Sequence, residues 1–296
     1  MNHDEPLFHY CTPQTFHSIV SRQSIWLSSM TLSNDTQEGR IVRKVIVKLI
    51  AEAGMGAEDS EDIFYAVDAI EDFVDGLALC LSEEGDLLSQ WRGYANDGQG
   101  FSIGFDTTYL QSLVETSQKP GAKEWEEYRR QGMMLKKVLY SEEEHLNFVQ
   151  PMFAKVLEKY EDLKRFRGDG LVNNIGVSAQ MLDPSYNTQL TSLKHEMRGE
   201  IVTFFKYLFE LKGYAFREEK EWRLLSLCIG SIGCRFRAVD NKIVPYREFP
   251  LKDHAHAVRT IYIGPKNMTP ISVVEAFVRS CGFQDVAVLP SEATYR

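Results

Sequence analysis

The stretch LSEEGDLLSQWRGYANDGQGFSIGFD, residues 81–106, decides the fold class of this chain. It starts at the end of the apolar run Leu77–Ser82, which predicts a buried strand. Leu87–Ala95 then predicts a short helix, and the glycines after it predict a turn. Phe101–Phe105 alternates large apolar and small residues, as a strand does. A strand, a helix and a second strand in one short stretch indicate a fold that mixes both element types.

Further strand-like runs lie on both sides of this stretch. Leu7–Tyr10 and Ile25–Ser29 are two of them, with a helix expected in between because Thr12 and Pro13 are typical of a helix start. Later runs lie at Glu221–Ile229, Cys234–Val239, Val258–Ile263 and Val286–Leu289. A further helix is predicted over Ile271–Cys281. Strands from both ends of the chain are therefore expected to build the core.

The middle of the chain has a different pattern. Residues 107–212 are rich in charge and mostly helical in spacing, with one strand-like break at Val138–Tyr140. We therefore predict one α+β domain over residues 1–296. In it, 1–106 and 213–296 form a strand-rich core with a mixed or antiparallel sheet, and 107–212 is a large helical insertion.

Two more helices are predicted upstream of Leu77. Ile41–Ala53 has apolar residues at helical spacing, and Ile63–Val74 follows it. The acidic run Glu58–Asp62 predicts a loop between the two helices. These helices are counted with the strand-rich core.

The composition is typical of a globular protein. Of the 296 residues, 44% are hydrophobic and 25% are charged. The net charge of −9 disfavours a protein that coats nucleic acid or anionic membrane, because such proteins need an excess of Lys and Arg. Five widely spaced cysteines without a CxxC pattern are typical of a reducing compartment. No secretion signal and no apolar run of membrane-spanning length is seen, so a cytoplasmic location is expected.

Two polar sites near the N-terminus are candidates for ligand binding. His9 ends the first strand, where a neutral imidazole could donate a hydrogen bond to a ligand; the alternative is an ordinary core or surface histidine. Asn34, Asp35 and Glu38 precede a helix, where they could bind a ligand or form a helix cap and capping box. Both readings stay open, because a helix start also offers free N–H groups to phosphates.

Two other candidates lie in the middle and late parts of the chain. Trp91 and Tyr94 share one helical face and could stack on a flat ring, or could both be core aromatics. Glu221 and Arg223 share one face of a strand whose other face carries Trp222. A carboxylate beside an arginine stays ionised and oriented, and the alternative is a solvated ion pair on an edge strand. No metal-ligating cluster is predicted.

Several segments in order resemble a bacterial family of proteins, domain of unknown function 2971. The segments are LFHYCT (7–12), IWLSS (25–29), SNDTQEG (33–39), the stretch 81–106, EKEWRLL (219–225), IYIGP (261–265) and a closing Tyr-Arg. The opening strand, with its His-Tyr-x-Thr sequence, also resembles the start of ADP-ribosyltransferases, including toxins that modify DNA. The resemblance to domain of unknown function 2971 covers both ends of the chain and leaves out most of 107–212.

The resemblance to ADP-ribosyltransferases implies a fold and a reaction. It implies a sheet core of that type and transfer of ADP-ribose from NAD, the substrate, to a protein or nucleic-acid acceptor, as in a toxin or phage-defence effector. His9 would hold the ribose and Glu221 the 2′-hydroxyl of the nicotinamide ribose, so both are expected to be catalytic. The residues expected to bind NAD are Tyr10, Thr12, Ser28, Asn34, Asp35, Glu38, Trp91, Tyr94 and Arg223. The Tyr or Ser-Thr-Ser of the family's middle motif has no clear counterpart here.

Two other functions remain as alternatives. Lysines and arginines gather in the insertion, among them Lys155, Lys159 and Lys164, and would suit a module that senses nucleotides or nucleic acid. Interleaved Glu and Asp equally predict a solvated helical face. A metal-dependent nuclease is the third reading, in which carboxylates such as Asp35 and Glu219 would hold Mg²⁺.

Overall fold

The computed structural model describes residues 5–32, 38–71, 74–118, 132–170, 184–239, 241–251 and 253–295. The chain forms two compact units: the first consists of 1–34, 76–138 and 215–296, and the second of 35–75 and 139–214. These bounds differ from those of the expected insertion, 107–212. The first unit keeps a helix and a strand from within that range, and the second takes in the helices before Leu77.

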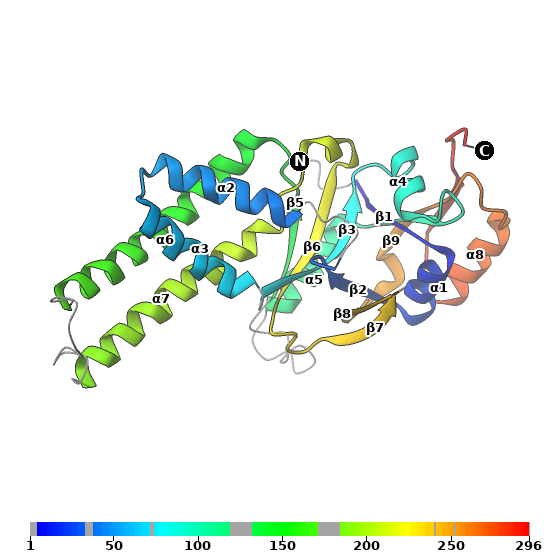
Figure 1. The fold of residues 1–296 in the computed structure, drawn as a ribbon. Coiled ribbons are helices and arrows are strands. Elements are labelled where there is room, and N and C mark those ends of the chain that lie inside the picture. The colour runs from blue at the N-terminus through cyan, green and yellow to red at the C-terminus, as the bar shows by residue number, and fades with distance from the viewer. Residues whose placement is uncertain are drawn as a thin grey trace. The chain divides into compact units, whose positions relative to one another are not determined.

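The first unit contains the sheet and the shorter helices (Figure 1). Its strands are β1 (Leu7–Cys11), β2 (Ser24–Ser29), β3 (Val74–Ser82), β4 (Phe101–Phe105), β5 (Met133–Lys137), β6 (Glu221–Ile229), β7 (Arg235–Val239), β8 (Lys242–Pro250), β9 (Val258–Ile263) and β10 (Ala287–Pro290). Its helices are α1 (Pro13–Arg22), α4 (Leu88–Tyr94), α5 (Thr107–Gln118) and α8 (Ile271–Ser280). The first two residues of β3 are grouped with the second unit.

The strands form one mixed sheet in the order β10-β9-β4-β1-β3-β2-β8-β7, and β6 pairs with both β3 and β5. β10 runs parallel to β9, whereas β1 is antiparallel to both β3 and β4. The prediction of an α+β chain with a mixed sheet is therefore confirmed. β3 is the strand around which the rest is organised, because β1, β2 and β6 all pair with it.

The main core lies on one face of this sheet. Alternate residues of the strands, such as Leu79 on β3 and Ile103 on β4, pack there against α1, α5 and α8. The helix α1 begins as its sequence predicts, since Thr12 caps it by accepting a hydrogen bond from the Thr15 N–H at 3.2 Å. Its buried side chains Phe16 and Val20 then cover the sheet.

A smaller core lies on the other face and holds α4. Phe8 and Tyr10 of β1 pack there with Trp91 and Ala95. Tyr10 meets Trp91 edge to face, with 4.9 Å between the ring centroids. The two faces of β1 therefore differ, since Leu7 belongs to the main core. This arrangement leaves the helix α4 beside the first strand.

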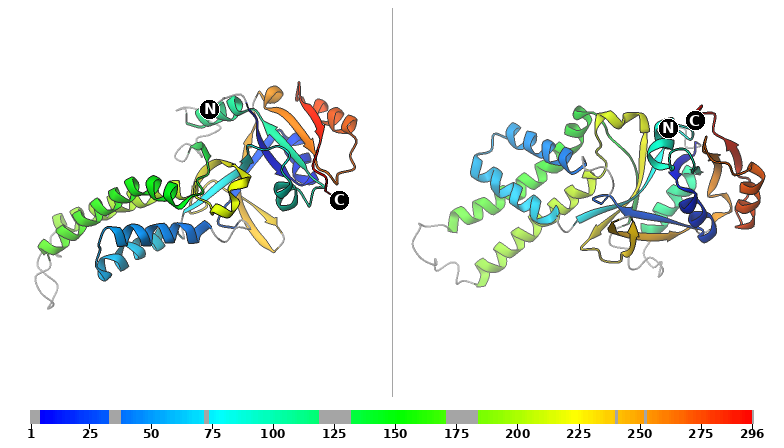
Figure 2. Two further views of the ribbon diagram at one scale, coloured as in Figure 1. Left: turned by 90° about the horizontal axis from the view of Figure 1, so that it is seen from above. Right: turned by 45° about the vertical axis from the view of Figure 1, so that its right-hand side comes forward.

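The described part of the second unit includes the helices α2 (Glu38–Glu52), α3 (Ala57–Glu71), α6 (Glu142–Gly170) and α7 (Pro184–Leu208). Figure 2 shows α6 and α7 running alongside each other. Their apolar stripes supply buried residues such as Phe153 and Phe204, whose rings lie 6.2 Å apart. No helix within the described ranges is long and apolar enough to cross a membrane.

The helix α3 corrects one expectation. The acidic run Glu58–Asp62, predicted to be a loop, lies in the first turns of α3, and Val74 begins a strand instead of ending the helix. The physical reason is the helix dipole, because carboxylates are stabilised near the free N–H groups of a helix start. The acidic run is therefore a helix-start signal in this chain.

Candidate functional site

The pairing between β1 and β3 stops at a gap that His9 fills. β1 pairs with β4 along its whole length, but its register with β3 contains the pair Phe8–Ser82 alone. Beyond that pair, His9 Nδ1 lies 2.9 Å from the carbonyl oxygen of Cys80. Since a carbonyl accepts hydrogen bonds and does not donate them, Nδ1 carries the hydrogen and the neutral ring presents Nε2 as an acceptor. The side chain of Cys80 is exposed, so solvent reaches the sheet beside this gap.

The surroundings of His9 favour the neutral ring. Burial lowers the pKa of His9 below its ordinary value, and the hydrogen bond with the Cys80 carbonyl opposes this in part. A neutral imidazole at this position can accept a hydrogen bond from a ligand hydroxyl without adding positive charge.

We expect His9 to make the stability of the protein depend on pH. As the pH drops below 6.5, the ordinary pKa of histidine, the unfolded chain binds a proton at His9 that the folded chain does not bind. The free energy of unfolding therefore decreases as the pH falls, until the pH reaches the lower pKa of the folded state. The variant His9→Asn places an amide N–H near Nδ1 and does not titrate. Urea unfolding between about pH 7.5 and about pH 5 should show wild type losing stability relative to this variant. A difference that stays constant with pH would contradict the prediction.

Glu221 and Arg223 form a buried ion pair on β6. Arg223 Nε donates to Glu221 Oε1 at 2.7 Å, and Arg223 Nη2 donates to Oε2 at 3.2 Å. The side chains are 5% and 1% exposed. Leu224 points into the main core and Trp222 packs against it, so the predicted alternation along this strand is confirmed. The carboxylate is therefore held in one orientation.

β3 links the His9 gap to this ion pair. Ser82 pairs with Phe8 of β1, and the Ser82 hydroxyl donates to the carbonyl oxygen of Glu219 at 2.7 Å. Glu83, the residue directly after β3, donates its N–H to the Lys220 carbonyl at 3.2 Å. The start of β6 is therefore level with the end of β1–β3 pairing. His9 and Glu221 therefore lie on strands that both pair with β3 near the same end of it.

Tyr94 lies on α4 at this same end. Its hydroxyl donates to Glu219 Oε1 at 3.3 Å, while its side chain remains 47% exposed. Glu219 itself is buried, immediately before β6. Of the predicted aromatic pair, Tyr94 is thus the one whose ring is open to a ligand.

Three other residues predicted to bind NAD are engaged in the fold. The Tyr10 hydroxyl donates to the Glu84 carbonyl and accepts the N–H of Leu87, both at 2.8 Å. Thr12 caps α1. Trp91 is fully buried, and its Nε1–H donates to Asp86 Oδ1 at 2.6 Å. The Tyr10 contacts hold the start of α4 against β1, and the Trp91 contact joins α4 to the residues before it. Thr12 fixes the first turn of α1.

Four residues predicted to bind NAD remain. The structure describes the side chain of Ser28 but not those of Asn34, Asp35 and Glu38. Ser28 on β2 accepts a hydrogen bond from Arg237 Nη2 at 2.9 Å. Asn34 and Asp35 lie outside the described residues. Glu38 begins α2, and its side chain is outside the described part of the structure. Arg237 is a residue that the sequence reasoning missed, although two arginines at alternate positions of β7 signal a shared face.

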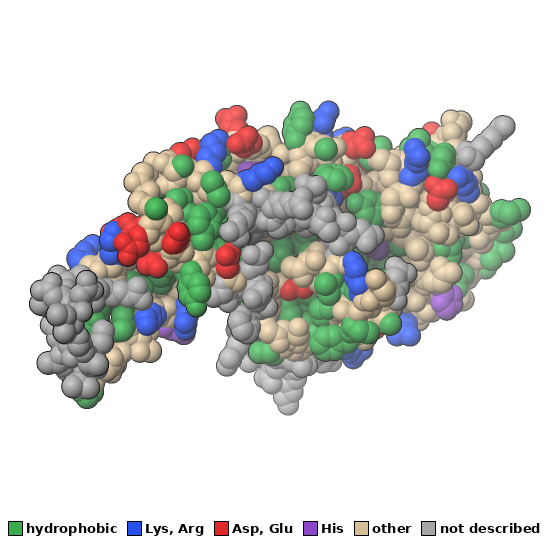
Figure 3. Space-filling view, in the orientation of Figure 1, with side chains coloured by type: hydrophobic (Ala, Val, Ile, Leu, Met, Phe, Trp, Pro, Cys, Tyr) green, Lys and Arg blue, Asp and Glu red, His purple; other side chains and the backbone are tan. Residues whose placement is uncertain are grey.

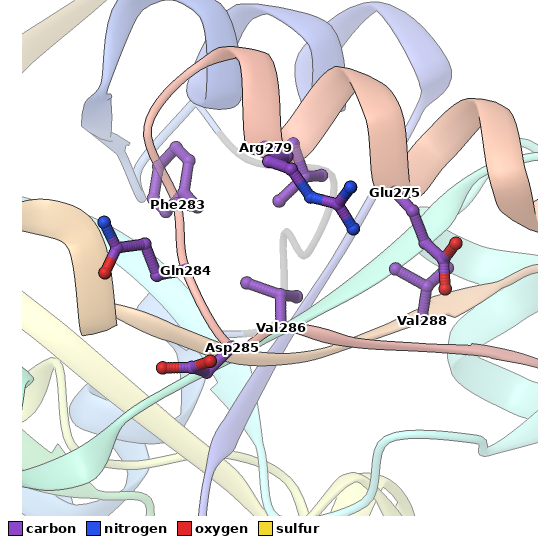
Figure 4. Close-up of a pocket in the computed structure, with 8 residues that line it drawn as sticks. Glu275, Arg279, Phe283, Gln284, Asp285, Val286 and Val288 are labelled. Carbon is purple, nitrogen blue, oxygen red and sulfur yellow. The ribbon is translucent and has the colours of Figure 1, made fainter.

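A cavity of about 370 Å³ lies elsewhere in the first unit (Figure 4). It is bordered by α8 and β10, with Val286 and Val288 on one side and the side chains of Glu275 and Arg279 reaching over them from α8. None of the predicted site residues lines this cavity. The candidate catalytic and binding side chains, His9, Tyr94 and Glu221, do not line it. The cavity at α8 is therefore not part of the candidate site.

Comparison with known proteins gives one match. The model of the family described as "Protein of unknown function (DUF2971)" matches residues 90–224, from α4 into β6. No curated protein and no solved structure matches the chain. The matched range includes Trp91, Tyr94, Glu221 and Arg223, so the predicted resemblance to this family is confirmed. The match also spans residues 107–212, most of which the ordered segments had left out. Residues 90–224 of this chain are therefore similar to the DUF2971 family of proteins of unknown function.

Proposed function

We propose that this protein is an ADP-ribosyltransferase-like enzyme that takes NAD as its substrate. One observation carries the proposal. A neutral histidine on β1 and an oriented, buried carboxylate on β6 flank the same end of β3. The sheet is interrupted there, and the exposed Tyr94 ring lies beside it. A sheet core of the ADP-ribosyltransferase type is part of the same proposal.

The residues suit the cleavage of a glycosidic bond. The bond between nicotinamide and the ribose C1′ breaks, nicotinamide leaves with the bonding electron pair, and the ribose passes through an oxocarbenium-like state. Glu221 accepts a hydrogen bond from the 2′-hydroxyl and stabilises the positive charge that develops on the ribose. His9 accepts a hydrogen bond from a ribose hydroxyl at Nε2. The acceptor forms the new bond to C1′ and loses its proton to solvent.

The acceptor in this proposal is a protein side chain or a nucleic-acid base, and the biological role is that of a toxin or phage-defence effector. The proposed location is the cytoplasm, a reducing compartment that suits a chain with five widely spaced cysteines and no CxxC pattern.

The test is release of nicotinamide from NAD. Purified protein is incubated with NAD that carries a label on the adenine, together with cell extract, and both free nicotinamide and label on macromolecules are measured. We expect Glu221→Gln to lower the rate by about 100-fold or more, because an amide cannot stabilise positive charge as a carboxylate does. His9→Asn should also lower it, since the amide cannot place an acceptor at Nε2.

Two controls make this test decisive. Glu142→Gln changes an exposed carboxylate on α6 and should leave the rate unchanged. Circular dichroism and thermal unfolding show whether each variant is folded. If wild type releases no nicotinamide and transfers no label, or if folded Glu221→Gln and His9→Asn both equal wild type, the proposed function is wrong.

The structure offers less support for a nucleic-acid sensor. Basic residues of the second unit already contact carboxylates: Lys159 contacts Glu196 at 3.1 Å, and Lys164 contacts Asp59 at 2.7 Å. Figure 3 shows positive and negative side chains interspersed over the face that is drawn. Such pairing is typical of a solvated helical surface. For these reasons we place the enzyme ahead of the sensor.

Within the described structure, no group of metal-ligating side chains supports the hypothesis of a metal-dependent nuclease. Among the residues described, no three His, Cys, Asp or Glu side chains are grouped as a metal site requires. Asp35, one of the carboxylates considered for Mg²⁺, lies outside those residues.

A further inference from the structure

Four side chains from three strands form what we name the Arg237 cluster: Trp26, Ser28, Arg237 and Tyr246. The guanidinium of Arg237 lies over the ring of Trp26 at 5.2 Å and over that of Tyr246 at 5.8 Å. The two rings are themselves 4.8 Å apart. Arg237 Nη2 donates to the Ser28 hydroxyl at 2.9 Å. All four side chains are partly exposed, so the cluster is ordered by its own contacts and remains open to a ligand.

The charge of Arg237 is desolvated without a carboxylate beside it. Within the described part of the chain, its hydrogen bond goes to a neutral hydroxyl, and its Nε–H is buried without an acceptor. Burial lowers the pKa of Arg237 accordingly. Arg235, two residues earlier on the same strand, instead forms an ion pair with Glu248. A desolvated cation is costly unless an opposite charge accompanies it, so Arg237 is arranged for an anion that is not part of the protein.

The donors of the cluster define the kind of anion. The guanidinium fork binds two oxygens of a planar carboxylate or a phosphate side by side. The Ser28 hydroxyl accepts from Arg237, so its own hydrogen is free to be donated to the same ligand. The aromatic rings restrict the guanidinium to one orientation, which lowers the entropy lost on binding.

The position of the cluster connects it to the proposed site. Ser28 pairs with Ala78 of β3 and so shares its face, and Cys80 lies two residues farther along that face, about 7 Å away. Cys80 in turn bears the carbonyl that His9 contacts. The cluster therefore lies about two residues along β3 from the His9 gap.

We propose that Arg237 and Ser28 bind the phosphoryl oxygens of a nucleoside diphosphate group. The Arg237 cluster is then the diphosphate subsite of the enzyme. This inference rests on the proposed function for the identity of the substrate. The contacts that recognise the diphosphate are independent of the catalytic step, so binding can be measured without turnover.

The experiment measures the affinity of ADP-ribose, ADP and inorganic pyrophosphate by calorimetry, with tryptophan fluorescence as a second signal from Trp26. Arg237→Met keeps the length of the side chain and removes its charge and donors. It should weaken binding of ADP-ribose and ADP by about tenfold or more, because hydrogen bonds from a charged donor to the phosphoryl oxygens are lost. Arg237→Lys keeps the charge but loses the fork and should fall between wild type and Arg237→Met. Ser28→Ala should weaken binding by a smaller factor.

Arg235→Met is the matched control, since it removes an arginine from the same strand that already has a carboxylate partner. It should bind ADP-ribose as wild type does. If Arg237→Met is unfolded by circular dichroism, the comparison rests on Arg237→Lys and Ser28→Ala. Equal weakening by Arg235→Met and Arg237→Met would indicate a general charge effect and overturn the proposal, as would unchanged affinity in all the variants.

The outcomes also separate this inference from the proposed function. Binding of ADP and pyrophosphate that depends on Arg237, without any release of nicotinamide from NAD, would retain the subsite and reject the enzyme. Release of nicotinamide whose KM for NAD is unchanged in Arg237→Lys and Ser28→Ala would retain the enzyme and reject the subsite.

Discussion

Replacing Arg223 by leucine is expected to lower the free energy of unfolding by about 3–5 kcal/mol, because it leaves a buried carboxylate without its ionic partner. Arg223 donates two hydrogen bonds to Glu221, and both side chains are almost completely buried. Leucine cannot donate either bond, and water has little access to replace them. Equilibrium unfolding in urea, followed by circular dichroism, measures the change.

The double variant Glu221→Leu with Arg223→Leu is the control for this prediction. Removing both charges at once abolishes the cost of an unpaired carboxylate, and replacing buried ion pairs by apolar residues is often nearly neutral. We therefore expect the double variant to be clearly more stable than Arg223→Leu alone. It should nevertheless be inactive if the proposed function is right. A double variant as unstable as the single one would show that the loss arises from packing and not from the carboxylate.

The second large effect is expected from Gly100→Ala. A Cβ atom at this position would lie 2.1 Å from the carbonyl oxygen of Cys11 and 2.9 Å from that of Ala95. Both are backbone atoms, held in place where β1, β4 and the end of α4 meet, so they cannot rotate away as a side chain would. Overpacking of a core costs about 1–3 kcal/mol, and we expect a loss at or above the upper end of that range.

Gly93→Ala is the matched control. Gly93 lies in α4, and an added Cβ would meet nothing within 4 Å. Alanine is favoured over glycine inside helices, so this change should raise stability by about 0.5–1 kcal/mol. Thermal and urea unfolding of the two variants test both signs together. If Gly100→Ala is as stable as wild type, the close approach of β1 to this glycine is wrong.

The strands with a strong local pattern were predictable. β6 carries Trp222 and Leu224 on one face and Glu221 and Arg223 on the other, and its predicted range, Glu221–Ile229, is confirmed. The helix α1 was also recognisable, because Thr12 and Pro13 mark its first turn. β8 was not predicted, since Pro245 and several charged residues weaken its pattern, yet it pairs with both β2 and β7. Its pairing comes from its neighbours and not from its own propensity.

The candidate site shows the same division. Alternation along one strand predicted that Glu221 and Arg223 share a face, and their ion pair confirms it. Tyr94, on the short helix α4, is partly exposed. That Tyr10 and Trp91 would be buried could not be decided from sequence, because an aromatic residue serves equally well in a core or a pocket. β5, which pairs with β6, was hidden by its lysines.

Local pattern was therefore enough for the mixture of helices and strands, the start of α1 and the two faces of β6. These features depend on residues within a few positions of one another, where periodicity and capping act. Long-range packing set the rest. The gap that His9 fills depends on a strand 71 positions away, and the bond between Ser28 and Arg237 joins residues 209 positions apart. No periodicity encodes such contacts, because they arise when strands distant in the chain become neighbours in one sheet.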